Sequence, residues 1–369
     1  MKVAMVVPGG VDRGGVERVI PSLLSVIERI ARVHELHVFA LTQEPRPGRW
    51  ALRGAQVHNA GRRPVRVTAF GQLLAEHRRA PFHVMHGVWA GCGTLAGAAG
   101  RLLRRPVVLH LPGGCVAAVP EVGWGLCLTR RGRATLRLAA ATADRVTVPS
   151  ERMRALAAAR GMDAERLTYG VGLDAWPPLP PRRRAPDAPA RLLFVASLNV
   201  VKDPATVIRA AARLREMGVR FRLDVLGEDL RGGEIHRLTT VLGLGGIVHF
   251  HGVIPQADLR PWMERADLLL LASRHEGDPM VALEAAVAGV PTVGTAVGHL
   301  PEWAPDAAAV VPFADPDALA AAVAEVLGDE DRRLRMAAAA QRHAIHHDAD
   351  HAAGRILRIY DELHEASSR

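Results

Sequence analysis

Two glutamates, Glu276 and Glu284, stand eight positions apart where a predicted loop runs into a predicted helix. Glu284 is the only charged residue between Met280 and Gly289, in a run that is otherwise apolar. A carboxylate in such surroundings needs a hydrogen-bonding partner. A ligand with paired hydroxyl groups, such as a ribose, would supply one. The spacing therefore predicts a site for a hydroxyl-rich ligand.

Between the two glutamates, Pro279 marks the expected start of the helix. The fixed φ of proline suits the first helical position, and its missing N–H costs nothing there. The N–H groups of Met280 and Val281 would then point back toward the loop. Helix N-termini of this kind bind phosphate and other anions.

Lysine is rare in this chain. Lys and Arg number 47 together, yet the only lysines are Lys2 and Lys202. Lys202 lies just after an apolar run and just before a helical one. In a chain that uses arginine almost everywhere, an internal lysine indicates a site that needs a compact, mobile charge, as phosphate sites do. The alternative is a surface lysine at the start of a helix.

Short β-rich runs alternate with helical stretches along the whole chain. The predicted strands are residues 3–7, 36–41, 83–86, 107–111, 146–148, 192–196, 221–226, 248–251, 268–271 and 291–294. Such alternation predicts parallel sheets covered by helices on both faces, hence an α/β fold of two doubly wound domains. Ligands of these domains lie beyond the carboxyl ends of the strands. The loop at 9–15 and the loop of Glu276 both follow strands.

The domain organisation follows from length and proline content. A chain of 369 residues suits two domains better than one. Residues 176–189 are dense in proline and predict an interdomain linker. We expect a first domain at 1–175, a linker at 176–190 and a second domain at 191–345. A C-terminal helix at 346–369 is expected to cross back to the first domain.

Charge is uneven between the two halves. Residues 1–180 carry a balance of +13, and the remainder carries −4. A basic first half predicts contact with an anionic acceptor or an anionic membrane surface. The alternative is an arginine-rich chain decorating solvated faces. Nucleic acid is disfavoured as a partner, because only 4 % of residues are aromatic and no binding motif occurs.

The cysteines and the N-terminus bear on location. Three cysteines without a CxxC pair indicate a reducing compartment and argue against disulfides or structural zinc. The start of the chain predicts a first strand rather than a signal peptide, and no apolar run approaches the ~18 residues of a membrane span. We therefore expect a cytoplasmic protein, with peripheral contact at the inner face of the membrane as an option.

The same residues carry a resemblance to a known family. Glu276 to Glu284 resembles the Glu-x7-Glu signature of glycosyltransferase family 4, and Lys202 matches the lysine that binds the diphosphate in that family. Gly14-Gly15-Val16-Glu17 resembles its Gly-Gly-x-Glu loop, and Gly298-His-Leu-Pro-Glu302 matches its Gly-x-x-Pro-Glu element. The match runs nearly the whole length. It implies the GT-B fold, in which two Rossmann-like domains face a central cleft.

The resemblance also implies an activity and roles for residues. It implies a retaining glycosyltransferase of the hexosyltransferase type, which uses a nucleoside-diphosphate sugar (UDP- or GDP-linked) as co-substrate, with no metal and no other cofactor. Lys202 and Glu276 would be catalytic, together with His110, which ends a predicted strand before a glycine turn. The alternative for His110 is a core histidine whose hydrogen bonds are made within the protein. Donor-binding residues implied are Gly14, Gly15, Lys202, Val253, Glu276, Gly277, Asp278, Pro279, Met280, Val281 and Glu284.

Departures from the family pattern leave a second hypothesis open. An arginine usually stands five positions before the lysine, but here that position is Ser197. The chain could therefore be a non-catalytic GT-B protein that binds a nucleotide sugar or a partner. A nicotinamide-dependent dehydrogenase is disfavoured, since the glycine fingerprint is missing. His343, His347 and His351 recur every four residues and could bind zinc on one helix face, although a solvated face is the commoner outcome.

The acceptor is not disclosed by the sequence. A lipid carrier, a growing oligosaccharide and a small metabolite all stay open. The nucleobase and the sugar of the donor are open as well.

Overall fold

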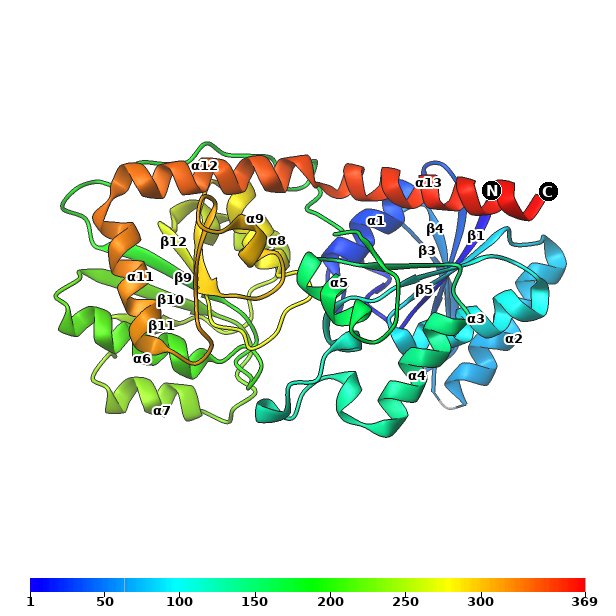
Figure 1. The fold of residues 1–369 in the computed structure, drawn as a ribbon, viewed down its shortest axis with the longest axis horizontal. Helices are drawn as coiled ribbons and strands as arrows, with labels where there is room; N and C mark the ends of the chain where they lie inside the picture. The colour runs from blue at the N-terminus through cyan, green and yellow to red at the C-terminus, as the bar shows by residue number, and fades with distance from the viewer. Residues whose placement is uncertain (63, 369) are drawn as a thin grey trace. The chain divides into compact units, whose positions relative to one another are not determined.

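The computed structural model describes residues 1–62 and 64–368 of the chain, apart from the side chain of residue 368. The chain forms two compact units, one of residues 1–170 and 347–369 and one of residues 171–346. Each unit is built on its own sheet (Figure 1).

The first unit contains a sheet in the order β3-β4-β2-β1-β5-β6-β7-β8. Its strands are β1 (Lys2–Val7), β2 (Glu35–Ala40), β3 (Gly48–Leu52), β4 (Ala55–Asn59), β5 (Val84–Val88), β6 (Val107–His110), β7 (Arg145–Val148) and β8 (Glu165–Arg166). Its helices are α1 (Pro21–Ala31), α2 (Val65–Arg79), α3 (Ala90–Leu103), α4 (Arg130–Ala141), α5 (Glu151–Ala158) and α13 (Ala349–Ser368), with short 3-10 turns at Gly113–Val116, Pro120–Val122 and Leu126–Leu128. Within the described residues every strand pair is parallel except β3 with β4.

Helices cover both faces of this first sheet. On one face, Ile27 of α1 and Tyr360 of α13 pack into the core that contains Val3 and Val38. On the other face, Leu73 of α2 packs with Phe39 and Phe82. In Figure 1, α13 (red) runs beside α1 (blue). The Tyr360 hydroxyl lies 2.6 Å from Nδ1 of His86 in β5, so the C-terminal helix is part of the core of the first unit.

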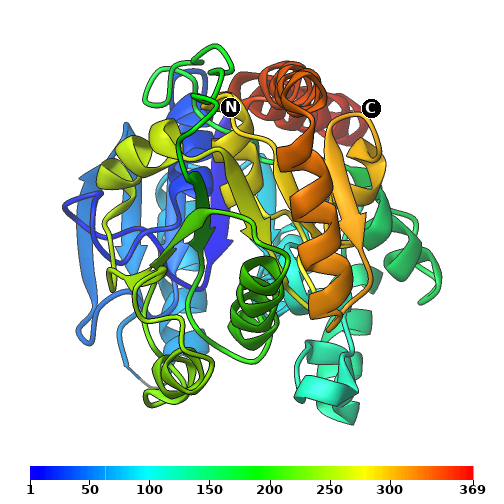
Figure 2. The same ribbon diagram turned by 90° about the vertical axis from the view of Figure 1, so that its left-hand side faces the viewer.

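The second unit contains a six-stranded parallel sheet in the order β11-β10-β9-β12-β13-β14. Its strands are β9 (Ala190–Val195), β10 (Phe221–Leu226), β11 (Val248–Phe250), β12 (Leu268–Leu271), β13 (Thr292–Thr295) and β14 (Ala308–Val311). Its helices are α6 (Pro204–Glu216), α7 (Glu234–Val241), α8 (Gln256–Arg265), α9 (Met280–Val287), α10 (Leu300–Trp303), α11 (Pro316–Gly328) and α12 (Glu330–His346). Figure 2 looks toward this unit and shows its helices around the sheet.

The second sheet is also buried from both sides. Val207 of α6 and Val323 of α11 pack on one face. Met263 of α8 and Leu283 of α9 pack on the other. Strands buried on both faces are apolar throughout, as in β12, which reads Leu-Leu-Leu-Leu. Two doubly wound α/β units are therefore confirmed.

The proline-rich segment is not a free linker. The chain passes from one unit to the other at Gly170–Val171, and the segment after it packs on the second unit. Trp176 is buried, the Leu179 N–H donates to the Val287 carbonyl at 3.0 Å, and Arg182 pairs with Asp267 at 3.1 Å. Proline prevents regular secondary structure in a segment but does not prevent it from packing. The prediction of a linker at 176–190 was therefore wrong.

The described part of the chain holds no helix that is both long enough and apolar enough to cross a membrane.

Candidate functional site

The order of strands in the second sheet defines where a ligand can bind. From β9 the chain proceeds outward to β10 and β11, whereas β12, β13 and β14 lie on the other side of β9. The loops after β9 and β12 therefore diverge, and doubly wound sheets bind their ligands at such a point, beyond the carboxyl edge of the sheet. The loop after β9 carries Lys202, and the loop after β12 carries Glu276.

The structure brings these two side chains together. The Lys202 ammonium donates a hydrogen bond to Oε1 of Glu276. The Ser273 hydroxyl donates to the same oxygen at 2.7 Å. Ser273 is buried, and its carbonyl accepts from the Thr295 hydroxyl at 2.6 Å. The carboxylate of Glu276 is thus oriented by a fixed serine and a mobile lysine.

The backbone around Lys202 is held by its neighbours. Oδ1 of Asn199 accepts from the N–H groups of Val201 and Lys202, each at 3.0 Å. Asp203 adopts a left-handed conformation with φ of +46°, which is unusual for a residue other than glycine. Its Oδ2 accepts from Nε of Arg274 at 2.7 Å. Asp203 thereby ties the lysine loop to the loop of Glu276.

Helix α9 begins at Met280, one residue later than predicted. Pro279 has ψ of 84° and stands at the N-cap position, so its backbone is not helical. Its carbonyl accepts from the Ala282 N–H at 2.8 Å. The N–H groups of Met280 and Val281 precede this first hydrogen-bonded turn and belong to the end of the helix that favours anions.

The Gly298 element supports the start of α9. Gly298 has φ of +54°, and a Cβ there would lie 2.3 Å from Cδ of Pro279. Only glycine fits this approach. The neighbouring His299 places Nδ1 3.0 Å from Oδ1 of Asp278. Gly277 is buried between these contacts and Glu276.

Glu284 is buried, as the sequence predicted, with 7 % of its surface exposed. Burial raises the pKa of its carboxyl to about 7, although a hydrogen bond from Gln256 opposes the shift. The Gln256 amide donates to Oε1 at 2.9 Å. A carboxyl with this pKa is partly protonated at neutral pH, and hydroxyl donors from a ligand would favour its charged form.

The loop after β11 carries the predicted nucleobase contact. Gly252 has φ of +68°, and its carbonyl accepts from the Gly227 N–H at 2.7 Å. The next residue, Val253, is well exposed. A contact between the backbone around Gly252 and Val253 and the nucleobase stays a prediction.

The first unit places its glycine loop at the equivalent position. In its sheet the strand order reverses between β1 and β5, and the loop after β1 contains Gly14 and Gly15. Asp12 organises this loop. Its Oδ2 accepts from the Gly14 N–H at 3.2 Å, and its carbonyl accepts from the Gly15 N–H at 3.0 Å. Gly15 has φ of +65°, which favours glycine.

His110 lies inside the first unit. It is 2 % exposed, and its Nδ1 lies 2.9 Å from the Thr147 hydroxyl. Its ring stacks on Tyr169 with centroids 4.3 Å apart. Burial lowers the pKa of His110 to about 3, so the imidazole is neutral at ordinary pH. These contacts are those of a satisfied core histidine, and a role for His110 in transfer stays a prediction.

The predicted histidine face at the C-terminus is not continuous. Helix α12 ends at His346 and α13 begins at Ala349. His343 and His351 therefore lie in different helices, because the break at 347–348 interrupts the 3.6-residue period. The interpretation of one helix face carrying His343, His347 and His351 was wrong.

Two loops of the second unit hold most of the predicted donor-site residues. The loop after β9 carries Lys202, and the loop after β12 carries Glu276, Gly277 and Asp278 and leads into α9. Sequence reasoning missed Ser273 and Gln256, which hold the two glutamates. Ser273 stands three residues before Glu276, a spacing that could have indicated it. Gln256 lies on another helix, and no local pattern marks it.

Comparisons with known proteins identify the family and the fold. The profile of glycosyl transferases group 1 matches residues 179–343, and that of the glycosyl transferase 4-like domain matches residues 14–169. A D-inositol 3-phosphate glycosyltransferase from Thermobispora bispora is 33 % identical over 224 residues, covering 56 % of this chain and 52 % of that protein. The chain spans about half the length of the curated relatives it matches.

Solved structures share the fold at low sequence identity. Sucrose-phosphate synthase from Thermosynechococcus elongatus superposes with a TM-score of 0.81 at 19 % identity over 99 % of each chain. Anabaena HepE, determined with UDP and glucose, superposes with a TM-score of 0.77 at 17 % identity over 98 % of this chain and 100 % of that one. The fold is that of the GT-B glycosyltransferases. The two profiles together cover most of the chain. The chain therefore belongs to the family 4 glycosyltransferases, with a glycosyl transferase 4-like domain followed by a glycosyl transferases group 1 domain.

Proposed function

We propose that this protein is a retaining glycosyltransferase that moves a sugar from a UDP-linked donor to an acceptor hydroxyl, without a metal ion in the transfer step. The observation that carries the proposal is the juxtaposition of Lys202, Glu276 and the N-terminus of α9 at the switch point of the second sheet. UDP is preferred to GDP because the structural relative HepE was determined with UDP. GDP is the alternative donor base.

The chemistry demands a stabiliser for the leaving diphosphate. Breaking the anomeric C–O bond leaves charge on that group, and preorganised donors lower the barrier. Lys202 and the N–H groups of Met280 and Val281 would meet the phosphate oxygens. Glu276 would accept hydrogen bonds from the donor sugar through the oxygen that neither Lys202 nor Ser273 contacts.

Lys202 would reach the diphosphate from its contact with Glu276. Its ammonium has three N–H donors, so one of them can remain on Glu276 while another meets a phosphate oxygen. The side chain is 31 % exposed, so it can swing toward a diphosphate without unfolding its loop. Glu284 would meanwhile accept hydrogen bonds from the ribose hydroxyls, beside its contact with Gln256.

The acceptor is proposed by class. Residues 61–143 include twelve arginines against two glutamates, and helices α3 and α4 contain no acidic residue. This charge suits an anionic acceptor, and the acceptor named for the curated relatives, inositol 3-phosphate, is one. An anionic lipid carrier at a membrane surface would use the same charge, as would an acidic oligosaccharide. A cytoplasmic location is proposed together with this acceptor class.

The test is a transfer assay without added Mg²⁺ or Mn²⁺. UDP-glucose, UDP-N-acetylglucosamine and GDP-mannose are each offered with inositol phosphates and with anionic lipid vesicles, and products are detected by mass spectrometry. The proposal predicts transfer or slow hydrolysis of a UDP-sugar, with an α-linked product from an α-linked donor by NMR. Turnover that requires a divalent ion would refute metal-free transfer, and a β-linked product would refute retention. Binding of UDP without any turnover would favour the non-catalytic hypothesis that Ser197 raised.

A further inference from the structure

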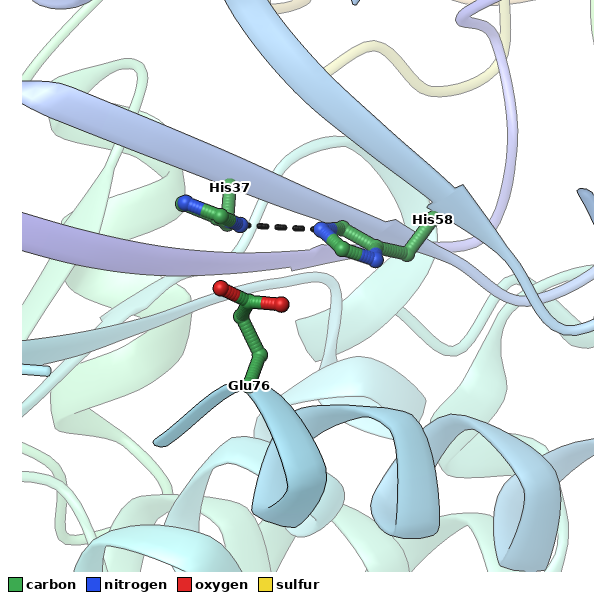
Figure 3. Close-up of side chains that lie close together, drawn as sticks. All are labelled: His37, His58 and Glu76. Atoms are coloured by element: carbon green, nitrogen blue, oxygen red, sulfur yellow. Dashed lines mark hydrogen bonds between the residues drawn. The ribbon is translucent and has the colours of Figure 1, made fainter. Parts of the chain in front are cut away.

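The first unit contains a cluster of three potential metal ligands that sugar transfer does not use. His37 lies in β2, His58 in β4 and Glu76 in α2, and Figure 3 shows their side chains converging between the sheet and the helix. All three are buried, at 6 %, 1 % and 8 % exposure. Burying three ionisable groups in one place is costly unless they have partners.

The three side chains are close enough to share one ion. One ligand atom from each lies within 4.8 Å of the others. Nδ1 of His37 is 2.9 Å from Nε2 of His58. Two imidazole nitrogens at this distance share a proton, and a metal ion that binds both would replace that proton.

The protonation states of the two histidines can be inferred from their contacts. Nε2 of His37 lies 2.9 Å from Oε1 of Glu35. A carboxylate only accepts, so this nitrogen carries the proton and Nδ1 of His37 presents a lone pair. The shared proton therefore comes from Nε2 of His58.

Two further contacts resemble the surroundings of a metal site. The hydrogen bond from His37 to Glu35 fixes the ring and raises the basicity of its other nitrogen, as second-sphere carboxylates do. Aromatic rings enclose the pair, with Phe39 stacked on His58 at 4.7 Å and Phe82 edge-on to His37 at 5.5 Å. When Nε2 of His58 binds the ion, the proton of that imidazole moves to Nδ1, which is buried and has no hydrogen-bond partner among the described residues.

Lys2 is the competitor for this position. Its ammonium lies 3.0 Å from Oε1 of Glu76 and 3.5 Å from Oε1 of Glu35. It thus stands between the two carboxylates and can remain on Glu35 when Glu76 turns to an ion. Arg79 also contacts Glu76, at 3.3 Å, from the exposed side.

We propose that His37, His58 and Glu76 bind one divalent transition-metal cation of the Zn²⁺ type, which pins α2 to the sheet of the first unit. Two imidazoles and one carboxylate suit Zn²⁺. Ca²⁺ and Mg²⁺ prefer sites made of oxygen alone. The site is independent of sugar transfer and lies outside the residues assigned to it. It also runs against the expectation of no metal, which rested on the cysteines and on residues of the donor site.

The experiment measures Zn²⁺ and Co²⁺ binding by the full chain after treatment with a chelator. Equilibrium dialysis with elemental analysis gives stoichiometry, and visible absorption of the Co²⁺ form reports coordination. His58→Phe removes a ligand while keeping the aromatic stack on Phe39. The matched control is the double variant His343→Gln/His351→Gln, which removes other histidines that could bind zinc adventitiously.

The proposal predicts one equivalent of Zn²⁺ in the wild-type protein and in the control. His58→Phe should bind it at least ~100-fold more weakly, because the loss of a ligand costs more than the ~10–100-fold that the loss of a second-sphere partner costs. Lys2→Met should bind it more tightly, by several-fold, because the competing ammonium is gone. A purely structural polar cluster would not show this gain.

Several outcomes would overturn the proposal. One is the absence of stoichiometric binding to the wild-type protein at micromolar Zn²⁺. Another is binding that survives unchanged in His58→Phe. Circular dichroism shows whether His58→Phe folds. If it does not, the Co²⁺ spectrum of the wild type and Zn²⁺ binding by Lys2→Met test the site instead. Absorption typical of six-coordinate aqueous Co²⁺, or no gain in Lys2→Met, would then reject the site.

Discussion

The two lysines of this chain form the same kind of pair in two different settings. Lys2 is the first residue of β1, is 4 % exposed and contacts Glu76 of α2 at 3.0 Å. Lys202 follows β9, has a side chain that is 31 % exposed and contacts Glu276. The first pair lies at the amino end of its sheet and the second beyond the carboxyl end of its own.

The setting decides what each pair can do. At the amino end Lys2 has no route to a ligand other than a small ion, since α2 and Phe82 cover it, with the ring centroid 5.0 Å away. Lys202 stands in a loop at a switch point, where doubly wound sheets bind their ligands. A buried ion pair holds structure and gains little net free energy. The lysine of the second pair is partly exposed, so it can contact a diphosphate.

The largest expected effect is a difference in kcat between variants of the two lysines. Lys202→Ala should lower kcat by about 10²–10³-fold, the usual loss when one donor to a developing negative charge is removed. Lys2→Met should leave kcat within about twofold. Steady-state kinetics with a UDP-sugar measure both. Comparable losses in the two variants would show that the distinction between the pairs is wrong.

For the free energy of unfolding, we expect the larger loss in Lys2→Met and the smaller one in Lys202→Ala. Lys2→Met leaves Glu76 buried with only the exposed Arg79 as its partner, so the free energy of unfolding should fall by about 3 kcal/mol. Lys202→Ala should change it by no more than about 0.5 kcal/mol. Urea denaturation in metal-free buffer tests this ordering. A stable Lys2→Met protein would mean that the buried pair contributes nothing.

Glu284 gives a pH-dependent prediction of comparable size. Its pKa is raised to about 7 in the donor-free protein, chiefly by burial. The folded state therefore holds a proton that the unfolded state releases near pH 4.5, and wild-type stability falls as the pH rises from about 5 toward 8. Glu284→Gln lacks this loss. The free energy of unfolding of the wild type, relative to that of Glu284→Gln, should therefore fall by about 3 kcal/mol over that range, at about 1.4 kcal/mol per pKa unit.

Urea denaturation of both proteins at pH 5 and pH 8 measures the effect. Saturating UDP should shrink the wild-type slope, because ribose hydroxyls favour the charged carboxylate. Parallel pH profiles for the wild type and Glu284→Gln would contradict the assigned burial of this carboxyl.

The smallest effect concerns Ser273. Its hydroxyl orients Glu276 at 2.7 Å but need not contact the ligand. Ser273→Ala should lower kcat/KM by about fivefold to tenfold, which corresponds to about 1 kcal/mol for one lost hydrogen bond. Thr295→Val is the matched control, since the Thr295 hydroxyl donates to the Ser273 carbonyl and not to Glu276. A loss as large as that of Lys202→Ala would give Ser273 a direct role.

The sequence predicted what depends on local pattern. Apolar strands such as β1 and β12 appear close to the expected residues because burial on both faces leaves apolar runs. The hairpin of β3 and β4 was missed, since its strands are short and partly polar. Its two-residue turn at Arg53 and Gly54, both with positive φ, was the available signal.

The site residues also divide into those that local sequence pattern predicts and those that it does not. Lys202, Glu276 and the start of α9 follow from residue type and spacing, and the fold brings them to one edge. Gln256 and the cluster of His37, His58 and Glu76 depend on contacts between elements distant in sequence. Spacings of 21 and 18 residues on three different elements carry no periodic signal.

The central claim is that Lys202, and not Lys2, serves the nucleotide. Isothermal titration calorimetry of UDP into the wild type, Lys202→Ala and Lys2→Met tests it directly. The account predicts binding to the wild type, an affinity at least ~10-fold weaker in Lys202→Ala, and an unchanged affinity in Lys2→Met, since each tenfold loss is 1.4 kcal/mol and a charged contact to phosphate supplies at least that. Equal affinity in Lys202→Ala and the wild type, or no binding of UDP to the wild type, would contradict it.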